Sequence, residues 1–282
     1  MVSNCEIGAQ SLIERGYAVL EDDSNLLPLV HAAFSEGLRF FGQADVSKRD
    51  ASVSKIIEGY LPMMSEFSVT EQRPDLCEGF AVWRRNSDDP DVKRWAPNTP
   101  LHVAMTATLP IYTGLANAIF EALRQKLNPR GGVLLDSEAS YLQMNQYRPA
   151  DHERDLLQDP HEDGHMLTVL RPTARGCEIR IGGEFTHIEI PGNAVLLMPG
   201  SLLTIMTGGV IPPLFHRVRN DRSTAIRQSM MYFINPTMLA ETYPWIENET
   251  NRGASIRTTA IQNSKNFGLP SLEKARKNSL YG

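Results

Sequence analysis

The segment from His161 to His165, "HEDGH", contains three kinds of metal-binding side chain, and its spacing allows two interpretations. In the first, His161, Glu162 and His165 form the H-E-x-x-H pattern of zinc hydrolases, which requires a helix so that positions i and i+4 share a face. In the second, His161 and Asp163 stand two residues apart on a strand, where both side chains point to the same side and can bind one metal ion. The two interpretations imply different metals, folds and reactions.

The residues around this segment favour a strand over a helix. Pro160 directly precedes His161, Gly164 separates the two histidines, and the strand-like run "MLTVL" follows. Glycine and proline both weaken a helix interior. On a strand, Glu162 is expected to point away from the metal. His165 is not needed as a ligand, and we expect it beside the site or at the surface.

A second histidine and a carboxylate-binding pair lie further along the chain. His216 occurs in "PPLFHRVRN", several predicted strands after His161. Two histidines and one carboxylate form the facial triad of Fe(II) oxygenases, which leaves three metal positions open. Arg227 and Ser229, in "RQSMMYF", are i and i+2 on a strand and therefore face the same way. A guanidinium fork and a hydroxyl suit a carboxylate, which Arg can bind bidentately.

The order and spacing of these motifs resemble the isopenicillin N synthase-like group of Fe(II)/2-oxoglutarate-dependent oxygenases. The matching elements are H-E-D at 161–163, H-R-V at 216–218, R-Q-S at 227–229 and "NQY" at 145–147, which is similar to the family's N-x-Y strand. "RGYAVL", "FFGQADVSKRD" and "DLCEGFAVW" resemble its N-terminal half more weakly, so the resemblance covers about residues 10 to 236. Gly208-Gly209, where the family usually has Asn before the second Gly, and the acidic stretch "ADHERDLLQDP" depart from the pattern.

The resemblance implies three metal ligands and four residues that bind a cosubstrate. The expected Fe(II) ligands are His161, Asp163 and His216. The expected contacts of 2-oxoglutarate are Arg227 and Ser229 on its distal carboxylate, with Tyr147 and Asn145 nearby. Fe(II), 2-oxoglutarate and O2 would together oxidise, most often hydroxylate, a C–H bond of a small molecule, with succinate and CO2 as coproducts. A carboxylate at 163 argues against a halogenase, which typically has a small residue there.

Alternatives remain open at this point. An oxidase of the same fold could use Fe(II) and O2 without 2-oxoglutarate, for cyclisation or desaturation, because its Arg-x-Ser pair can hold the carboxylate of the substrate. A zinc hydrolase is the alternative from another enzyme class, and a non-enzymatic binding module is the last. The sequence does not identify the substrate. Phe80, Trp83 and Arg84 are candidate substrate contacts because of their position relative to the family's motifs. Tailoring of secondary metabolites is an association with the family.

The elements that must position these residues divide the chain into three regions. Residues 1–130 read mainly helical, with apolar residues at helical spacing after an expected N-cap at Ser24 and again over 109–127, before Pro129 and Gly131-Gly132. Residues 131–236 alternate turns with short strand-like runs, which include "ASYLQMNQY", "HMLTVL", "CEIRI", "AVLLM", "LLTIM" and "RQSMMYFI". Residues 237–282 are polar and helix-leaning.

We therefore expect an α+β fold with a mainly β core, a double-stranded β-helix or jelly roll. A helical N-terminal region would pack on residues 131–236, the oxygenase core, and a helix-leaning C-terminal tail would follow, all in one catalytic unit.

Composition limits the partners and the compartment. The net charge is −5, and no basic block interleaved with aromatic residues is present, so we expect no nucleic-acid partner. The uncharged stretch 194–215 is interrupted by Pro and Gly, which predicts buried strands joined by turns and no membrane span. Three scattered cysteines and an N-terminus unlike a signal peptide predict a cytoplasmic protein with free thiols. The oligomeric state stays open.

Overall fold

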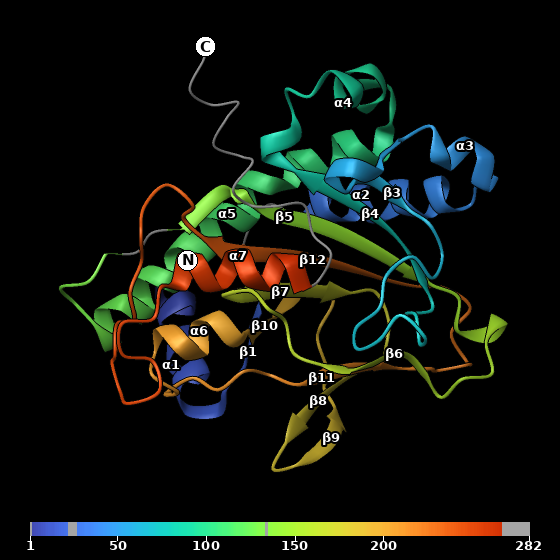
Figure 1. Cartoon of the computed structure of the whole chain (residues 1–282). Coiled ribbons are helices and arrows are strands. Elements are labelled where there is room, and N and C mark those ends of the chain that lie inside the picture. Colours follow the sequence, from blue (N-terminus) through green and yellow to red (C-terminus); the bar gives the residue numbers. More distant parts are fainter. Residues whose placement is uncertain (1, 22–26, 133–134, 267–282) are drawn as a thin grey trace.

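The structure, a computed structural model, describes residues 2–21, 27–132 and 135–266 and contains two antiparallel β-sheets (Figure 1). The larger sheet has the strand order β1 (Ala18–Glu21), β10 (Ala194–Pro199), β7 (Leu167–Pro172), β12 (Arg227–Pro236), β5 (Leu135–Tyr147), β4 (Cys77–Trp83), β3 (Glu58–Leu61) and β2 (Ser52–Val53). The smaller sheet has the order β6 (Leu156–His161), β11 (His216–Arg219), β8 (Cys177–Ile181) and β9 (Glu184–His187). The predicted α+β fold with a jelly-roll-like β core is confirmed.

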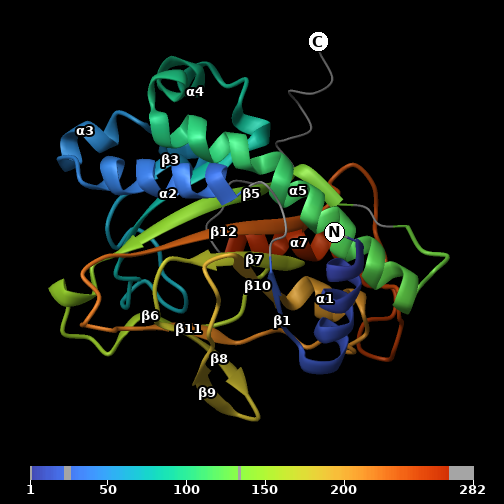
Figure 2. The same ribbon diagram turned by 180° about the vertical axis from the view of Figure 1, so that it is seen from behind.

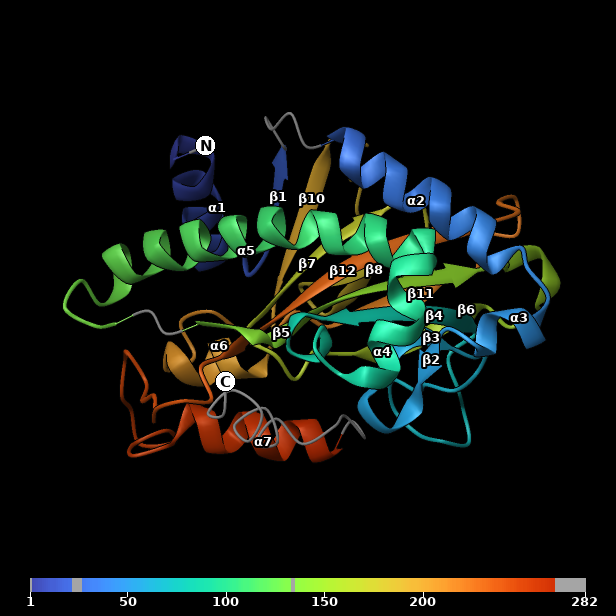
Figure 3. The same ribbon diagram turned by 90° about the horizontal axis from the view of Figure 1, so that it is seen from above.

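Helices cover the outer face of the larger sheet (Figures 2 and 3). The α-helices are α1 (Val2–Arg15), α2 (Leu27–Phe41), α3 (Asp45–Arg49), α4 (Pro90–Trp95), α5 (Pro100–Leu127), α6 (Ser201–Met206) and α7 (Ile256–Asn266). Single 3-10 turns occur at Ser54–Ile56, Arg84–Asn86, Ala96–Asn98 and Pro149–Asp151. Helices α1 and α2 pack on α5, and α7 packs on α6 and β12. The expected N-cap Ser24 lies outside the described residues.

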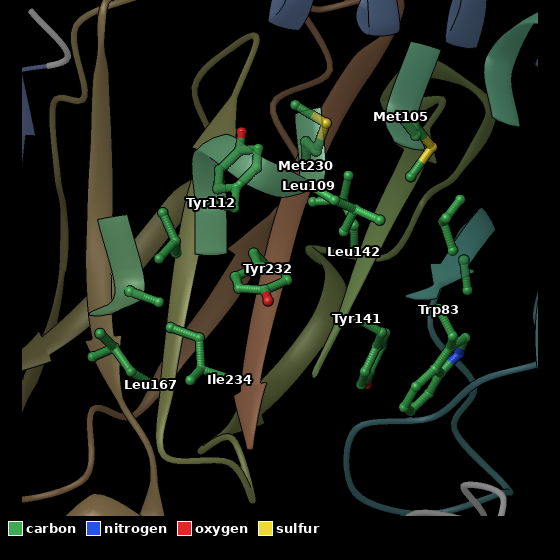
Figure 4. Close-up of a cluster of buried hydrophobic side chains, with 14 of the residues drawn as sticks. Trp83, Met105, Leu109, Tyr112, Tyr141, Leu142, Leu167, Met230, Tyr232 and Ile234 are labelled. Atoms are coloured by element: carbon green, nitrogen blue, oxygen red, sulfur yellow. The ribbon is translucent and has the colours of Figure 1, made fainter. Parts of the chain in front are cut away.

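The two faces of strand β12 lie in different environments. Its residues alternate, and side chains two apart on a strand share a face. Met230, Tyr232 and Ile234 enter the apolar core beneath α5, where Figure 4 shows Tyr232 on β12 near Tyr112 of α5. The intervening residues, Arg227, Ser229, Met231 and Phe233, line a cavity on the other face of the sheet. The larger sheet therefore separates an apolar core from a cavity with polar chemistry.

Several local predictions need correction. Helix α5 starts at Pro100 and not at residue 109, because Leu101 and Met105 extend its apolar stripe by two turns and both are buried. "LLTIM" forms the short helix α6 and not a strand, with Leu202, Leu203 and Met206 buried on one face. The stretch 194–215 is thus a strand and a helix. The N-terminal region also contributes four strands, β1 to β4, to the larger sheet.

Helix α5 is apolar over much of its length. Among the described residues, it is the one helix that is long and apolar enough to cross a membrane. Its buried side chains, which include Leu109, Ile119 and Phe120, belong to the same core cluster as residues of the larger sheet. It is therefore a partly buried core helix of this fold.

Candidate metal and cosubstrate site

His161 and His216 meet at adjacent ends of two paired strands. His161 is the last residue of β6, His216 is the first of β11, and the two are register partners with ring centroids 4.3 Å apart. In each ring, Nδ1 lies within hydrogen-bond distance of a carbonyl oxygen two residues earlier: 2.8 Å to Asp159 O for His161 and 3.1 Å to Leu214 O for His216. A carbonyl oxygen can only accept, so Nδ1 carries the proton and Nε2 keeps its lone pair for a metal.

Asp163 completes the group from the turn after β6. Its Oδ1 lies 3.8 Å from His161 Nε2 and 3.9 Å from His216 Nε2. The potential ligand atoms of the three residues all lie within 4.8 Å of one another. Its other oxygen, Oδ2, accepts a hydrogen bond from the buried Thr168 hydroxyl. Burial acts to raise the pKa of Asp163, but the nearby charges of His216 and His161 outweigh it and lower the pKa, so the carboxylate form is favoured.

The path of the chain at Asp163 differs from the predicted one. Strand β6 ends at His161, so Asp163 does not share a strand face with it. Instead, the turn packs against Gly200: Ser201 N donates to Asp163 O at 3.0 Å, and a Cβ at Gly200 would lie 2.5 Å from that same oxygen. His161 and Asp163 lie close together, as predicted. They are brought together by a turn that is held by close backbone packing, and not by a shared strand face.

His165 and Glu162 do not form the zinc site of the alternative interpretation. Residues 161–165 are not helical. The His165 ring is buried, with Nδ1 3.1 Å from Asn235 Oδ1 and Nε2 3.4 Å from the Tyr141 hydroxyl. The H-E-x-x-H interpretation is therefore wrong, and His165 lies beside the triad as expected. Glu162, predicted to point away, instead lines the same cavity.

Two imidazole nitrogens and one carboxylate oxygen in this arrangement fit Fe(II). These are the donor types of a facial triad, and all three residues line the cavity, so they would hold the metal at its wall. The set lies in a cavity of about 660 Å³. The donor types and their convergence, including the two Nε2 atoms left free by the Nδ1 hydrogen bonds, are what an Fe(II) site of this kind requires.

The four predicted cosubstrate residues form two cross-strand pairs in the same cavity. Arg227 pairs in register with Tyr147, and Ser229 pairs with Asn145, across β12 and β5. Arg227 Nη1 donates to Ser229 Oγ at 2.6 Å, and its guanidinium lies 5.0 Å from the centre of the Tyr147 ring. The structure thus brings together on one wall side chains that lie far apart in the sequence.

Arg227 is a buried cation without a protein counter-charge. It is 1% exposed, and its Nε donates to the Arg175 carbonyl oxygen at 3.0 Å. Among the described residues, no carboxylate forms an ion pair with it. A buried guanidinium without a carboxylate is costly unless a ligand supplies one. The Tyr147 hydroxyl, which donates to Gln158 Oε1 at 3.2 Å, and the Asn145 amide, which accepts from Gln143 Nε2 at 2.9 Å, lie on the same wall.

The cavity also contains residues that sequence reasoning did not identify. They are Glu66, Tyr141, Gln143 and Phe233, with Asp75 beside them. Gln143 and Tyr141 precede Asn145 by two and four positions on β5, so alternation along that strand was a usable signal for both. No signal of this kind marked Glu66, which comes from a long loop.

The substrate contacts expected from family position are wrong. Phe80 and Trp83 are 0% and 1% exposed and belong to the apolar core: Phe80 packs against Phe40, and Trp83 is covered by Tyr141, on which it stacks. Arg84 forms a surface ion pair with Glu138 at 3.0 Å. None of the three lines the cavity.

Comparison with known proteins supports the site and the fold. Residues 139–236 match the family model of the 2OG-Fe(II) oxygenase superfamily. The chain is 31% identical over 101 residues to deacetoxycephalosporin C hydroxylase of Streptomyces clavuligerus, covering 33% of this chain and 31% of that protein. It is also 31% identical over 98 residues to 2'-deoxymugineic-acid 2'-dioxygenase of Hordeum vulgare, covering 34% and 29%. The matches thus span about a third of the length of these relatives.

Solved structures extend the similarity of fold to nearly the whole chain. A full-length Neurospora crassa protein in complex with alpha-KG superposes with a TM-score of 0.74 at 16% identity, covering 93% of this chain and 90% of that one. A 2OG-Fe(II) oxygenase family protein from Caulobacter crescentus gives a TM-score of 0.74 at 20% identity, covering 94% of both chains. The match of residues 139–236 to the 2OG-Fe(II) oxygenase superfamily, the similarity of fold and the cluster of His161, Asp163 and His216 agree with one another.

Proposed function

We propose that this chain is an Fe(II)- and 2-oxoglutarate-dependent oxygenase that oxidises, most often by hydroxylation, a C–H bond of a small molecule, with succinate and CO2 as coproducts. One observation carries the proposal. A triad able to hold a divalent metal and a buried arginine without a protein counter-charge line the same cavity. A metal site and a carboxylate site within one small cavity suit a short dicarboxylic keto acid.

The protein's own residues have separate tasks in this proposal. His161 and His216 bind the metal through Nε2, with each ring held in orientation by its Nδ1 hydrogen bond. Asp163 adds a negative charge, and Thr168 holds its second oxygen. Arg227 and Ser229 bind the distal carboxylate of 2-oxoglutarate, with Tyr147 and Asn145 beside it. Fe(II) and 2-oxoglutarate supply the oxidising power when bound.

Apolar residues form part of the cavity wall, and in this proposal they shield the reacting groups from water. Leu170, Cys177, Met198 and Val218 line it from both sheets, and each is buried. A water-poor pocket strengthens the hydrogen bonds and charges within it and protects reactive species from side reactions. In this proposal, the protein orients the metal, the cosubstrate and the substrate and keeps water away from them.

A small-molecule substrate is supported by the relatives, which include a hydroxylase named for deacetoxycephalosporin C and a dioxygenase named for 2'-deoxymugineic acid. A role in secondary metabolism stays a prediction from the resemblance to the family. A cytoplasmic setting is supported by the three free and buried thiols, Cys5, Cys77 and Cys177. The division into residues 1–130, 131–236 and 237–282 remains a prediction.

The second candidate function is an oxidase of the same fold that does not use 2-oxoglutarate. The Arg227–Ser229 pair supports it equally, because the pair would bind a carboxylate of the substrate itself.

The test is anaerobic titration of the purified protein with Fe(II) and then with 2-oxoglutarate, followed by exposure to O2. We expect saturable binding of 2-oxoglutarate that depends on the metal, and one succinate formed for each O2 consumed. Metal binding without binding of 2-oxoglutarate or release of succinate would favour the oxidase. Absence of metal binding would contradict both.

A further inference from the structure

We propose that Glu66 binds a protonated amine of the substrate, so that this enzyme acts on small molecules with a cationic nitrogen next to an apolar or aromatic body. The inference rests on the proposed oxygenase function and names the substrate class of the same cavity. It depends on the position of Glu66, on its lack of a cationic partner among the described residues and on the aromatic wall near it.

Glu66 reaches the cavity from the loop between β3 and β4, residues 62–76. Figure 1 shows this loop passing from the larger sheet towards β6. Its backbone is fixed at several points: Asp75 N donates to Glu66 O at 2.9 Å, Leu76 N donates to Leu157 O at 2.8 Å, and Arg154 donates to Pro74 O at 2.8 Å. Glu66 is therefore held over the cavity by an anchored segment and not by a free loop.

The contacts of the Glu66 carboxylate leave it without a cation. Its Oε2 accepts a hydrogen bond from Gln143 Nε2 at 2.8 Å, and no described Lys, Arg or His forms an ion pair with it. Burial, and then the neighbouring charge of Asp75, raise the pKa of Glu66 to about 7, while the Gln143 hydrogen bond acts to lower it. A carboxylate desolvated in this way gains more from a bound cation than a solvated one does.

The second acidic group of the loop has its own partners. Asp75 accepts from the Ser68 hydroxyl at 2.8 Å and from Gln158 Nε2 at 3.1 Å. These neutral donors satisfy Asp75 without cancelling its charge. Asp75 thus makes this part of the cavity negative, and a bound cation would favour the ionised form of Glu66, whose pKa is raised to about 7.

The charge balance of the whole cavity favours a cationic guest. In the loaded site, the charges of a divalent metal, Asp163, a bound dicarboxylate and Arg227 cancel. The remaining acidic side chains of the lining are Glu66, Asp75 and Glu162, against the single exposed guanidinium of Arg49. A cavity with surplus negative charge attracts cations and rejects anions.

An aromatic wall completes the recognition surface. Tyr141 and Phe233 both line the cavity, with ring centroids 4.8 Å apart, and Trp83 stacks behind Tyr141 at 3.9 Å. Tyr141 is close enough to Glu66 for the charge of the carboxylate to contribute to its raised pKa, after the larger effect of burial. Aromatic faces bind apolar groups and attract ammonium ions. A carboxylate beside aromatic rings suits an amine on an apolar body.

The experiment measures binding and not turnover, in full-length protein loaded with Mn(II) and 2-oxoglutarate. Three probes of similar shape are titrated by calorimetry: 2-phenylethylamine, 2-phenylethanol and 3-phenylpropionate. We expect the amine to bind about tenfold more tightly than the alcohol, as a charge-assisted hydrogen bond provides, and the acid to bind most weakly. In Glu66→Gln, the preference for the amine over the alcohol should disappear.

Two control variants make the assignment specific. Glu71→Gln removes the same charge from an exposed position of the same loop and should keep the preference. Glu162→Gln should keep it as well; its loss there, with retention in Glu66→Gln, would overturn the role of Glu66. Equal affinity for amine and alcohol, tightest binding of the acid, or no binding of any probe would each overturn the proposal. Binding of 2-oxoglutarate to the Mn(II) protein is recorded separately, and its absence would instead contradict the oxygenase function.

Discussion

His161 of β6 and His216 of β11 are register partners in the smaller sheet, and both are expected ligands of the same metal ion. Each stands at the end of its strand that faces Asp163, and each ring is turned by a hydrogen bond from Nδ1 to the backbone two residues before it. The pairing of β6 with β11 therefore fixes where the two histidine residues stand, and each Nε2 atom lies within 4 Å of Asp163 Oδ1. Much of the geometry of the triad is built into the pairing of these strands.

Replacement of Asp163 should separate the triad from its neighbour His165. We expect Asp163→Asn to weaken Fe(II) or Mn(II) binding by more than about 100-fold, because the carboxylate is the only negative ligand and even outer partners of metal sites are worth about 10–100-fold. His165→Ala should leave metal affinity within about tenfold, because its ring bonds to Asn235 and Tyr141. Anaerobic calorimetry measures both. The opposite order of effects would restore His165 as a ligand.

Replacement of Arg227 should affect the cosubstrate and not the metal. In Arg227→Met, a similar apolar volume replaces the guanidinium, and we expect the Kd of 2-oxoglutarate to rise about 100-fold, as for loss of a buried partner of a carboxylate. Metal affinity should stay unchanged, because Arg227 does not belong to the metal-binding cluster. Arg180→Met, at an exposed position of β8, is the matched control. An unchanged Kd in Arg227→Met would contradict the assignment.

Gly200 should be required for the turn that carries Asp163. A Cβ there would lie 2.2 Å from His165 O and 2.5 Å from Asp163 O, so Gly200→Ala must displace this backbone. We expect a loss of about 1–3 kcal/mol in the free energy of unfolding, as for overpacking, and weaker metal binding. Urea unfolding and metal titration measure the two effects.

Gly192→Ala is the control for Gly200, because a Cβ at Gly192 meets no atom within 4 Å. It should leave both quantities near their wild-type values. A stable Gly200→Ala protein with full metal affinity would show that the turn can relax without moving Asp163.

The raised pKa of Glu66 should make the stability of the metal-free protein depend on pH. Its folded-state pKa, about 7, is above the usual 4.5, so its contribution is fully present below pH 4.5 and is lost as the pH rises through 7. Between pH 5 and pH 8 we expect the free energy of unfolding to fall by about 2 kcal/mol more in wild type than in Glu66→Gln, after allowance for partial contact with solvent.

The comparison between the two proteins isolates Glu66 from other groups. Burial lowers the pKa of His161 and His165, which acts in the opposite direction, but it does so in both proteins. Denaturant midpoints at pH 5 and pH 8 provide the measurement. Parallel pH profiles would show that the Glu66 carboxyl is solvated in the metal-free protein.

The sequence allowed the metal residues to be predicted because their types and order are restrictive, although the local argument for Asp163 was wrong. Alternation on a strand placed it beside His161, whereas β6 in fact ends at His161. The close approach that shapes the turn comes from Gly200, much later in the chain, and no local pattern reports such a contact. The same limit applied to "LLTIM", where a short apolar run fits a strand or a helix equally well.

The grouping of Arg227, Ser229, Tyr147 and Asn145 on one wall of the cavity was predictable, because alternation within each strand is a local property and the two strands pair in register. Their binding of a cosubstrate stays a prediction. Glu66 was not predictable, because its place depends on how the loop 62–76 crosses to β6. The predicted start of helix α5 was wrong for another reason. Pro110 lies inside the helix, and the buried stripe on both sides of it outweighs the local cost of the proline.

The anchoring of the loop 62–76 has a consequence for how this chain can diversify. The groups that would hold cosubstrate, and the two histidines that would hold metal, lie on strands of the two sheets, whereas Glu66 belongs to a connection between β3 and β4 in the N-terminal part of the chain. That connection meets β6 through one backbone hydrogen bond, from Leu76 N to Leu157 O, and through the side-chain pairs Arg73–Asp159 and Asp75–Gln158. Glu66 takes part in none of these contacts, so it can be exchanged by mutation without rebuilding the triad. Related enzymes can therefore keep the same metal and cosubstrate residues while the substrate that they accept changes. The sequence of loop 62–76 is the first place to look for that difference.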